Sequence, residues 1–303
     1  WGRLAIVPGL RWERYRLDAY PDEIYREDNP GVTPVDIAST SLTPKLGARM
    51  KIGARGSVYV HYARGYRAPP FSDVNVAFTI PTFNYVTLPN PDLRAETSHG
   101  VEIGYRYEGH GRRFELSAYE NRYRDLIESR ARVGTDPDTG ALLFQSVNRD
   151  RARIRGVEMS LSQSLGYFLH GNWSLRSAAA WARGDDTERD VPLNTVQPGR
   201  AVLGLRYQAL DWGAELTGTA VERVKRVDDS AGTLFRPPGY GVLDLFAWYE
   251  PAHHLRLHAG VFNLGDRRYW EWRSARNIAL DAEDRDFFTA PGIHASVGVS
   301  VFW

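Results

Sequence analysis

Apolar and polar side chains alternate with a period of two in segments spread along the chain. Val101, Ile103, Tyr105 and Tyr107 occupy every second position, with Glu102, Gly104 and Arg106 between them. The same alternation appears around residues 201–207, 255–261 and 297–303. Because successive side chains of a β-strand point to opposite faces, this pattern predicts strands with one apolar and one polar face. We count about 12 such strands, several of them long enough to cross a bilayer when tilted.

The predicted connections between these strands alternate in length. Short ones fall near residues 53–56, 109–112, 164–168, 209–212 and 251–254, and long polar ones at about 18–41, 68–97, 125–150, 184–197, 225–238 and 266–291. This rhythm is typical of outer-membrane barrels, which have tight turns at one end and long loops at the other. A soluble β-sandwich or carbohydrate-binding module gives no reason for every second connection to be long. No linker or repeat divides the chain, which therefore reads as one domain.

Composition narrows the classes of protein further. The 303 residues include no cysteine, which excludes disulfide frameworks, thiolate zinc sites and cysteine nucleophiles. The net charge is +1, from 38 basic and 37 acidic residues, which argues against a nucleic-acid partner. No apolar run approaches the roughly 18 residues of a transmembrane helix. Aromatic residues make up 12% of the chain, as expected for a barrel with aromatic girdles at the membrane interfaces.

The two ends of the chain carry different signals. Ser296, Gly298, Val301 and the terminal Trp303 follow a polar, glycine, apolar and aromatic order that resembles the recognition signal of outer-membrane barrels. The chain opens at Trp1, within a predicted strand and without a signal peptide. We therefore expect a mature protein lacking its start, or a fragment.

Four ordered motifs resemble those of TonB-dependent outer-membrane receptors. Residues 65–69 (Gly-Tyr-Arg-Ala-Pro) end a predicted strand, and residues 90–98 (Asn-Pro-Asp-Leu-Arg-Ala-Glu-Thr-Ser) close the long loop after it. Residues 153–158 resemble the family's strand with an inward arginine and glutamate, and residues 261–269 resemble its penultimate-strand motif. The resemblance extends over about residues 44–303.

The resemblance implies an all-β fold, an antiparallel transmembrane β-barrel with about 12 strands of a larger plugged barrel present. Residues 1–303 would form the C-terminal part of the barrel domain, and the plug domain and the segment that contacts TonB would be absent from this chain. Outer-membrane transporters of this kind have 22 strands and a plugged lumen. The resemblance also implies the outer membrane of a Gram-negative bacterium, contact with lipopolysaccharide, energy supplied through the TonB complex, no enzymatic activity and no intrinsic cofactor.

Residues 269–273 (Tyr-Trp-Glu-Trp-Arg), with residues 290–292 downstream, resemble the C-terminal loop of haem and haemoglobin receptors. This implies haem as the transported ligand, taken free or from a carrier protein. Such receptors place an iron ligand in the loop between the first two motifs, where this chain has no histidine and only one tyrosine, Tyr85. A tyrosinate ligates haem iron in catalase. We therefore predict Tyr85 as the axial iron ligand and His99, just after the loop, as a second haem-binding residue; the alternative for Tyr85 is packing within a folded loop.

Two other functions stay open at this point. One is a ferric-siderophore receptor of the same fold. The other is a plugless 12-stranded outer-membrane channel or hydrolase, which as a hydrolase needs a serine or aspartate paired with histidine. The sequence holds no such local set, although catalytic groups also assemble across strands.

Charged side chains on the polar face have a structural interpretation. Arg106, Arg155 and Arg206 are predicted to face a polar lumen. Arg67 and Glu96 are expected to pair at the barrel rim, where an exposed ion pair contributes under about 1 kcal/mol.

Overall fold

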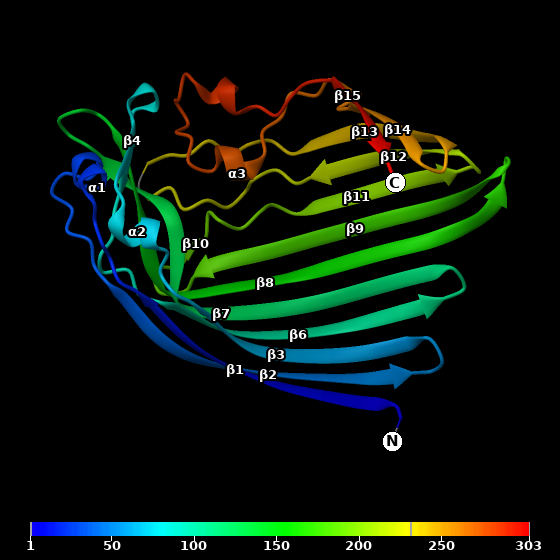
Figure 1. The fold of residues 1–303 in the computed structure, drawn as a ribbon, viewed down its shortest axis with the longest axis horizontal. Helices are drawn as coiled ribbons and strands as arrows, with labels where there is room; N and C mark the ends of the chain where they lie inside the picture. Colours follow the sequence, from blue (N-terminus) through cyan, green and yellow to red (C-terminus); the bar gives the residue numbers. More distant parts are fainter. Residues whose placement is uncertain (1, 231, 303) are drawn as a thin grey trace.

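Antiparallel strands make up most of the computed structural model, which describes residues 2–230 and 232–302 (Figure 1). Twelve strands follow one another across the sheet: β1 (Leu4–Leu17), β2 (Ile37–Ile52), β3 (Gly56–Arg67), β6 (Glu96–Gly109), β7 (Arg112–Thr135), β8 (Leu142–Phe168), β9 (Gly171–Asp186), β11 (Arg200–Gln208), β12 (Trp212–Val221), β13 (Tyr240–Ala252), β14 (Leu255–Phe262) and β15 (His294–Val301). Each pairs antiparallel with the next. The predicted all-β antiparallel architecture and the count of about 12 strands are confirmed.

The sheet is a curved, open wall in the described part of the chain. Strand β1 pairs there with β2 alone and β15 with β14 alone. The short turns lie at one end of the wall, on the right in Figure 1, and the long connections lie at the other. The predicted alternation of short and long connections is therefore confirmed. Of the predicted terminal signal, β15 is present as an edge strand; Trp1 and Trp303 lie outside the described residues.

The long connections contain short elements of their own. These are strands β4 (Phe78–Ile80), β5 (Tyr85–Leu88) and β10 (Val191–Pro192), helices α1 (Glu23–Asp28), α2 (Phe71–Asn75) and α3 (Trp272–Ala275), and 3-10 turns η1 (Pro81–Phe83) and η2 (Arg285–Phe288). Strand β5 pairs with β4 and, in parallel, with β8. Among the described residues, no helix has the length and apolar character that crossing a membrane requires.

One predicted long loop, residues 125–150, is wrong. Strands β7 and β8 continue through it, and only residues 136–141 form the turn between them. The carboxylate of Asp136 accepts hydrogen bonds from the backbone N–H groups of Asp138 and Thr139, at 2.9 and 3.0 Å, which fixes the turn. The polar residues on both sides show little alternation because this hairpin projects beyond the apolar part of the sheet. Its two strands are hydrogen-bonded to each other, and β8 is also paired with β5.

The short turn predicted at residues 164–168 is also misplaced. Those residues belong to β8, where the register shifts between Ser164 and Gly166, and the turn is formed by Leu169 and His170. Both turn residues have positive φ, 53° and 63°, as a two-residue hairpin turn of the right twist requires. Gly166, with φ of 97°, marks a bulge in the strand instead of the turn.

The two faces of the sheet differ as the alternation predicts. On the convex face, one row of paired residues runs across six strands: Ala48, Val60, Ile103, Ala118, Val157 and Trp181. Ile103 is 56% exposed and Val60 44%, so large apolar side chains lie open on this face. The concave face carries Tyr59, whose hydroxyl donates to Glu102 at 2.7 Å. Contiguous exposed apolar surface of this extent is typical of a face that contacts lipid.

The predicted lumen arginines divide between the two faces. Arg106 lies on the concave face, where it pairs with Glu115 at 2.7 Å, and Arg206 stacks on the Trp248 ring, 4.4 Å from its centroid. The prediction for Arg155 is wrong. It lies two positions before Val157 on the same strand, so its side chain shares the convex face. Glu158, of opposite parity, does face the concave side, where it lines a cavity with Glu102 and Glu115.

Candidate functional site

The long connections join into one layer over the end of the sheet, held by small buried clusters. Ile37, Val74, Leu93 and Ile127 form one cluster, which joins four segments far apart in sequence. A second contains Val224, Val227, Leu234 and Trp272, and a third contains Phe235, Ala275 and Ile278. These clusters of buried apolar side chains hold the long connections to one another and to the ends of β2 and β7, so the layer is packed.

The connection between β3 and β6 is fixed to β8 at its returning end. Asn90 donates from its side-chain amide to the carbonyl of Ser146 at 2.8 Å, and its own Oδ1 accepts the backbone N–H of Asp92 at 3.2 Å. The backbone N–H of Arg94 donates to Asn148 Oδ1 at 2.8 Å, and Asn148 returns a hydrogen bond to the carbonyl of Arg94 at 3.0 Å. The asparagine that begins the second sequence motif thus makes a turn and also anchors it.

The outgoing end of the same connection is fixed to the connection between β1 and β2. Asn75 is fully buried, accepts the Val35 backbone N–H at 2.8 Å and donates to the Val35 carbonyl at 3.1 Å. The Tyr25 hydroxyl donates to the Asn75 carbonyl, and burial raises the pKa of Tyr25, so the hydroxyl keeps its proton. These contacts order helix α2, which has only five residues.

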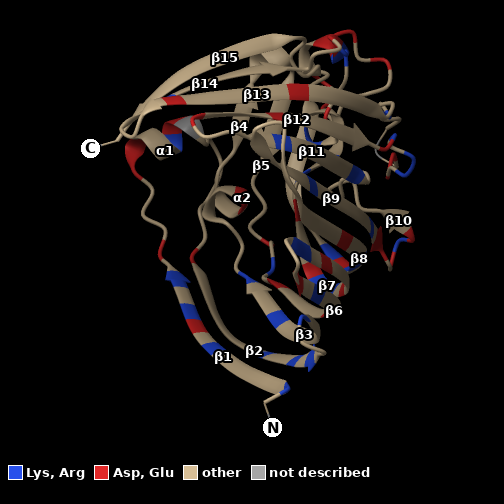
Figure 2. Ribbon diagram, turned by 90° about the vertical axis from the view of Figure 1, so that its right-hand side faces the viewer, with Lys and Arg blue, Asp and Glu red and all other residues tan. Residues whose placement is uncertain are grey.

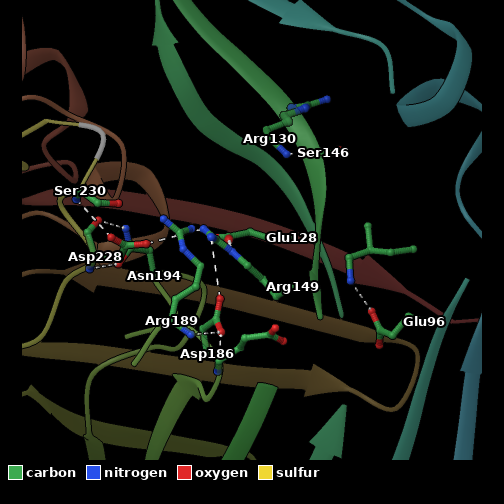
Figure 3. A network of polar contacts seen from close by, with 12 residues as sticks. Glu96, Glu128, Arg130, Ser146, Arg149, Asp186, Arg189, Asn194, Asp228 and Ser230 are labelled. Atoms are coloured by element: carbon green, nitrogen blue, oxygen red, sulfur yellow. Dashed lines mark hydrogen bonds and ion pairs between the residues drawn. The ribbon is translucent and has the colours of Figure 1, made fainter. Parts of the chain in front are cut away.

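The predicted rim pair is present and has a second role. Arg67 and Glu96 are directly opposite in the β3–β6 ladder, with 3.9 Å between Nη1 and Oε2. The same Glu96 oxygen accepts the backbone N–H of Ile127 at 3.0 Å (Figure 3). Ile127 lies just beyond the left-handed residue Asp125, with φ of 55°. Glu96 therefore fixes the base of the projecting β7–β8 hairpin.

Tyr85, the predicted iron ligand, lies at the first position of β5 and is half-buried. Its ring stacks on that of Phe144, with 4.5 Å between centroids. Phe144 is 2% exposed, so the Tyr85 ring rests on a fixed apolar support. The packing contact expected as the alternative is thus present.

His99 lies on the convex face and is exposed. It has the same parity on β6 as Val101 and Ile103, and its Nδ1 is 2.8 Å from the Tyr62 hydroxyl. Its ring lies nearly parallel to that of Tyr62, at 6.2 Å between centroids. Tyr85 belongs to the layer of long connections, so the structure does not bring these two predicted residues together.

A buried ion cluster, which the sequence did not indicate, joins the β7–β8 hairpin to the end of β9 and to the connection after β12. Arg149 of β8 lies among three carboxylates, and Figure 3 shows its guanidinium directed toward them. Its Nε is 2.6 Å from Glu128, and its terminal nitrogens are 3.9 Å from Asp186 and 3.7 Å from Asp228. A cavity of about 600 Å³ adjoins the cluster. The four side chains are at most 13% exposed, so the arginine is the charge that keeps three acids buried together.

Hydrogen bonds from the backbone extend this cluster. Asp186 Oδ1 accepts the N–H groups of Glu188 and Arg189, at 3.0 and 3.1 Å. Asp228 exchanges two hydrogen bonds with Asn194, at 2.7 and 2.8 Å. Sequence reasoning missed the cluster because its members come from separate connections, each of which reads as an ordinary polar loop.

Asp185, which precedes Asp186 at the end of β9, forms ion pairs with two arginines. Its carboxylate contacts Arg183 at 3.0 Å and also Arg226, from the connection after β12. Burial alone would raise the pKa of Asp185, but hydrogen bonds from Arg226 and Arg183 outweigh it, and the pKa lies below its ordinary value. The ionised form of Asp185 therefore favours the folded arrangement.

The last long connection is closed at its base by Asn263, which is 2% exposed. Its side-chain amide donates to the carbonyls of Arg267 and Pro291, at 2.9 and 3.1 Å, and its Oδ1 accepts the Arg267 N–H at 2.8 Å. Asp266 Oδ1 accepts the N–H of Ile293 at 2.8 Å. The asparagine and aspartate of the fourth sequence motif thus join the two ends of this connection.

The tryptophans of residues 269–273 join this connection to its neighbours, Trp272 by packing with Val224 and Val227 and Trp270 by packing on Phe235. Trp272 is 4% exposed and donates from Nε1 to the Asn194 carbonyl at 2.8 Å. Trp270 donates to the carbonyl of Arg285 at 3.0 Å. In the described part of the chain, no group of three or more histidine, aspartate or glutamate side chains has the arrangement of a metal site.

The sequence and the fold of this chain are similar to those of known proteins. Residues 1–264 match the family described as "TonB dependent receptor-like, beta-barrel". The chain is 29% identical over 246 residues to the probable hemoglobin and hemoglobin-haptoglobin-binding protein 4 of Haemophilus influenzae, covering 73% of this chain and 24% of that protein. It is 28% identical over 320 residues to hemoglobin and hemoglobin-haptoglobin-binding protein A of the same species, covering 94% of this chain and 28% of that protein. The chain thus spans about a quarter of the length of the curated relatives it matches.

Solved structures share the fold. The copper transporter OprC superimposes with a TM-score of 0.77 at 23% identity, covering 99% of this chain and 45% of that chain. The ferric enterobactin receptor PfeA of Pseudomonas aeruginosa, as a G324V mutant, superimposes with a TM-score of 0.66 at 22% identity, covering 100% of this chain and 43% of that chain. At these identities the likeness concerns the fold alone.

Proposed function

Because the chain belongs to the TonB-dependent receptor β-barrel family, we propose that it is the barrel portion of an outer-membrane receptor that captures haem and imports it with energy supplied through TonB. The long connections then face the outside of the cell and the short turns face the periplasm. Residues 1–303 supply 12 strands in this proposal, and the remaining strands, the plug and the TonB-contacting segment belong to other parts of the receptor. The family is one of receptors and transporters, and the proposal includes no catalytic step.

The observation that carries the choice of haem is the set of relatives. Proteins named for binding hemoglobin and hemoglobin-haptoglobin align with 73% to 94% of this chain. The siderophore receptors with the same fold are less similar in sequence, at 22% identity for PfeA. We therefore propose haem as cargo, delivered by a carrier protein that docks on the layer of long connections, and keep the ferric siderophore as the alternative that the experiment below tests.

Within this proposal Tyr85 is the axial ligand of the haem iron. Its ring is held by Phe144, which limits the positions available to the hydroxyl and reduces the entropy lost when the oxygen binds a metal. A tyrosinate oxygen is a ligand of ferric haem in catalase. His99 remains a second prediction, tested separately because its ring lies on the convex face beside Tyr62.

The test is a haem titration of the full-length receptor in detergent, followed by the Soret and charge-transfer bands. Tyr85→Phe removes only the hydroxyl and keeps the ring on Phe144, and Tyr20→Phe, at a 90% exposed loop position, is the matched control. We expect a ferric tyrosinate spectrum for wild type and Tyr20→Phe, and its loss in Tyr85→Phe. An unchanged spectrum in Tyr85→Phe would move the ligand elsewhere, and His99→Ala is then the next variant.

The same titration tests the substrate class. If the wild-type receptor binds no haem but takes up a ferric siderophore in cells, the haem proposal is wrong and the alternative holds. If haem binds and the siderophore does not, the proposal stands whichever residue provides the ligand.

A further inference from the structure

The last strand, β15, begins with a histidine that faces the concave side of the sheet. His294 is directly opposite Phe262 in the β14–β15 ladder. It has the same parity on β15 as Ser300, which lines a cavity on the concave face together with Arg206 and Trp248. In Figure 2 the sheet curves from β1 at the bottom to β15 at the top, so this face of β15 is turned toward the inner side of the curve.

The backbone just before His294 is held in place. The N–H of Ile293 donates to Asp266 Oδ1 at 2.8 Å. A Cβ on Gly292 would lie 2.6 Å from the same oxygen, which is closer than real Cβ atoms approach, so a larger residue there would displace the aspartate or the backbone. The base of the last long connection therefore sets the position of His294.

Two contacts fix the imidazole ring itself. Its plane is inclined by 23° to the ring of Phe262, with 5.1 Å between the centroids. Its Nδ1 lies 2.9 Å from the carbonyl oxygen of Gly292, and a carbonyl only accepts, so Nδ1 is the donor. The free lone pair of the neutral ring is then on Nε2. A hydrogen bond from the other ring nitrogen to a backbone carbonyl is the arrangement that orients histidines which bind a metal.

The ligating atom of this ring is open. His294 is exposed, and in the part of the chain that the structure describes no hydrogen bond is made to its Nε2. The other histidine at this edge of the concave face differs, because the Nε2 of His258 rests on Gly298, where a Cβ would overlap it. His294 thus combines a fixed ring with an accessible lone pair.

A second pair of stacked rings lies farther toward the long connections on the same face. Tyr240 has the parity of Trp248 on β13, and its ring lies 4.2 Å from that of Tyr269, centroid to centroid, at 30°. Binding sites for flat organic ligands are lined mainly by apolar and aromatic side chains with a few placed polar atoms. The concave face of β13–β15 provides both kinds of group.

We propose that His294 is an axial ligand for ferric haem at a second binding position, on the lumen side of the wall. The inference rests on the proposed function, since it takes haem as the cargo and the concave face as the lining of its path. Nε2 donates its lone pair to the iron, and no proton leaves the ring. Because the porphyrin occupies the equatorial positions of the iron, one histidine suffices. A bare metal ion needs several side chains, and no such group is gathered in the described part of the chain.

His294 and Tyr85 serve separate positions. Tyr85 belongs to β5, which pairs with β8, and β15 is the sixth strand along the sheet from β8. At about 4.8 Å per strand, roughly 29 Å of wall separates them. One haem is therefore not held by both residues. Tyr85 lies in the layer of long connections and His294 where the last of these connections enters the wall, so the cargo meets Tyr85 first.

The experiment is a haemin titration of the full-length receptor in detergent, which records the number of haem equivalents and the type of spectrum of each. His294→Phe keeps a ring on Phe262 but removes the ligand. His61→Phe, exposed on the concave face of β3, is the matched control. We expect one tyrosinate-type and one imidazole-type equivalent in wild type and in His61→Phe. In His294→Phe the imidazole-type binding should weaken at least tenfold and the tyrosinate-type binding change less than twofold, and Tyr85→Phe should show the reverse.

His294→Met separates iron ligation from packing. Methionine sulfur also binds haem iron, as in cytochromes c, so this variant is expected to keep the second equivalent with an altered spectrum. A second equivalent that is absent from His294→Met but present in His294→Phe would show that the ring serves only to pack on Phe262, and the proposal would be wrong.

The same titrations separate this inference from the proposed function. An imidazole-type equivalent that persists in His294→Phe, or that is lost equally in His61→Phe, overturns this inference alone. A wild-type receptor that binds a single haem of tyrosinate type does the same and leaves the proposed function in place. A receptor that binds no haem overturns both.

Discussion

Asn75 and Val35, 40 residues apart, exchange two hydrogen bonds in the same way as paired residues of a sheet, although neither belongs to a strand. The side-chain amide of Asn75, which is fully buried, bonds both the backbone N–H and the carbonyl of Val35. It thereby takes the place of a backbone partner on a neighbouring strand. The connection between β3 and β6, which holds Tyr85, is positioned through this contact.

Asn75→Ala is expected to loosen that connection while leaving the sheet intact. The substitution leaves the N–H and carbonyl of Val35 without partners, and each buried unsatisfied group costs about 1–3 kcal/mol. Hydrogen–deuterium exchange should increase at residues 32–37 and 71–90 and stay unchanged in β6. The exposed Asn172→Ala at a short turn is the control. Unchanged exchange around Val35 would contradict this account of the loop.

Arg149→Met is expected to release the connections after β9 and β12 from the β7–β8 hairpin together. The variant keeps a side chain of similar length but leaves Glu128, Asp186 and Asp228 buried without their shared cation, and removing one partner of a buried ion pair costs about 3–5 kcal/mol. Limited proteolysis should cut residues 187–199 and 222–239 faster than in wild type. Arg112→Met, an exposed arginine at the opposite end, should leave the cleavage rate unchanged. Cleavage confined to one of the connections would show that the cluster does not act as a unit.

Ile103→Arg tests the assignment of the convex face to lipid. An arginine near the middle of the lipid-facing surface of a barrel costs about 2–4 kcal/mol, and the cost falls to roughly 0–1 kcal/mol near the interface. Thr97→Arg, on the same face of β6 and directly opposite Arg124 at the long-connection end of the sheet, is the matched control. Urea unfolding of the receptor in liposomes should show a large loss of stability for Ile103→Arg and a small one for Thr97→Arg. Equal losses would mean that the apolar surface does not lie in the bilayer.

The pH dependence of the long connections should follow Asp185. Its pKa is lower in the folded protein than in the unfolded chain, so the folded state binds fewer protons between the two values. The stabilisation is present above about pH 4, the ordinary value of an aspartate, and is lost as the pH falls through the lower folded value. In urea unfolding, Asp185→Asn should be less stable than wild type at pH 6, with the difference shrinking toward pH 3. The exposed Asp138→Asn should show no such trend.

Much of the sheet was predictable because its faces have opposite chemistry. Alternation at residues 101–107 and 297–301 marks β6 and β15 correctly, since lipid on one side and a polar interior on the other impose a period of two. The β7–β8 hairpin was not predictable in this way. The adjacent residues Ile127 and Glu128 are both buried, at 5% and 7% exposure, so the pattern that identifies a strand disappears although the pairing continues.

The direction of the Arg155 side chain and the buried ion cluster could not be predicted from the sequence, for different reasons. Arg155 was expected on the concave face because arginine suits a polar lumen, but its parity with Val157 places it on the convex face. The partners of Arg149 lie 21 to 79 positions away along the chain and carry no local motif. Long-range contacts between polar loops are fixed by the tertiary arrangement, and no short sequence window contains them.

The closure of the last long connection by Asn263 and Asp266 bears on how such a receptor evolves. Because these hydrogen bonds join the two ends of the connection, the residues between them contribute little to holding the ends together. Each doubling in length of a flexible loop costs only about 0.6 kcal/mol in closure entropy. Insertions and deletions at the tip are therefore nearly neutral for folding, and in the proposed receptor the outermost residues of this connection can diverge while the hydrogen bonds at its base are kept.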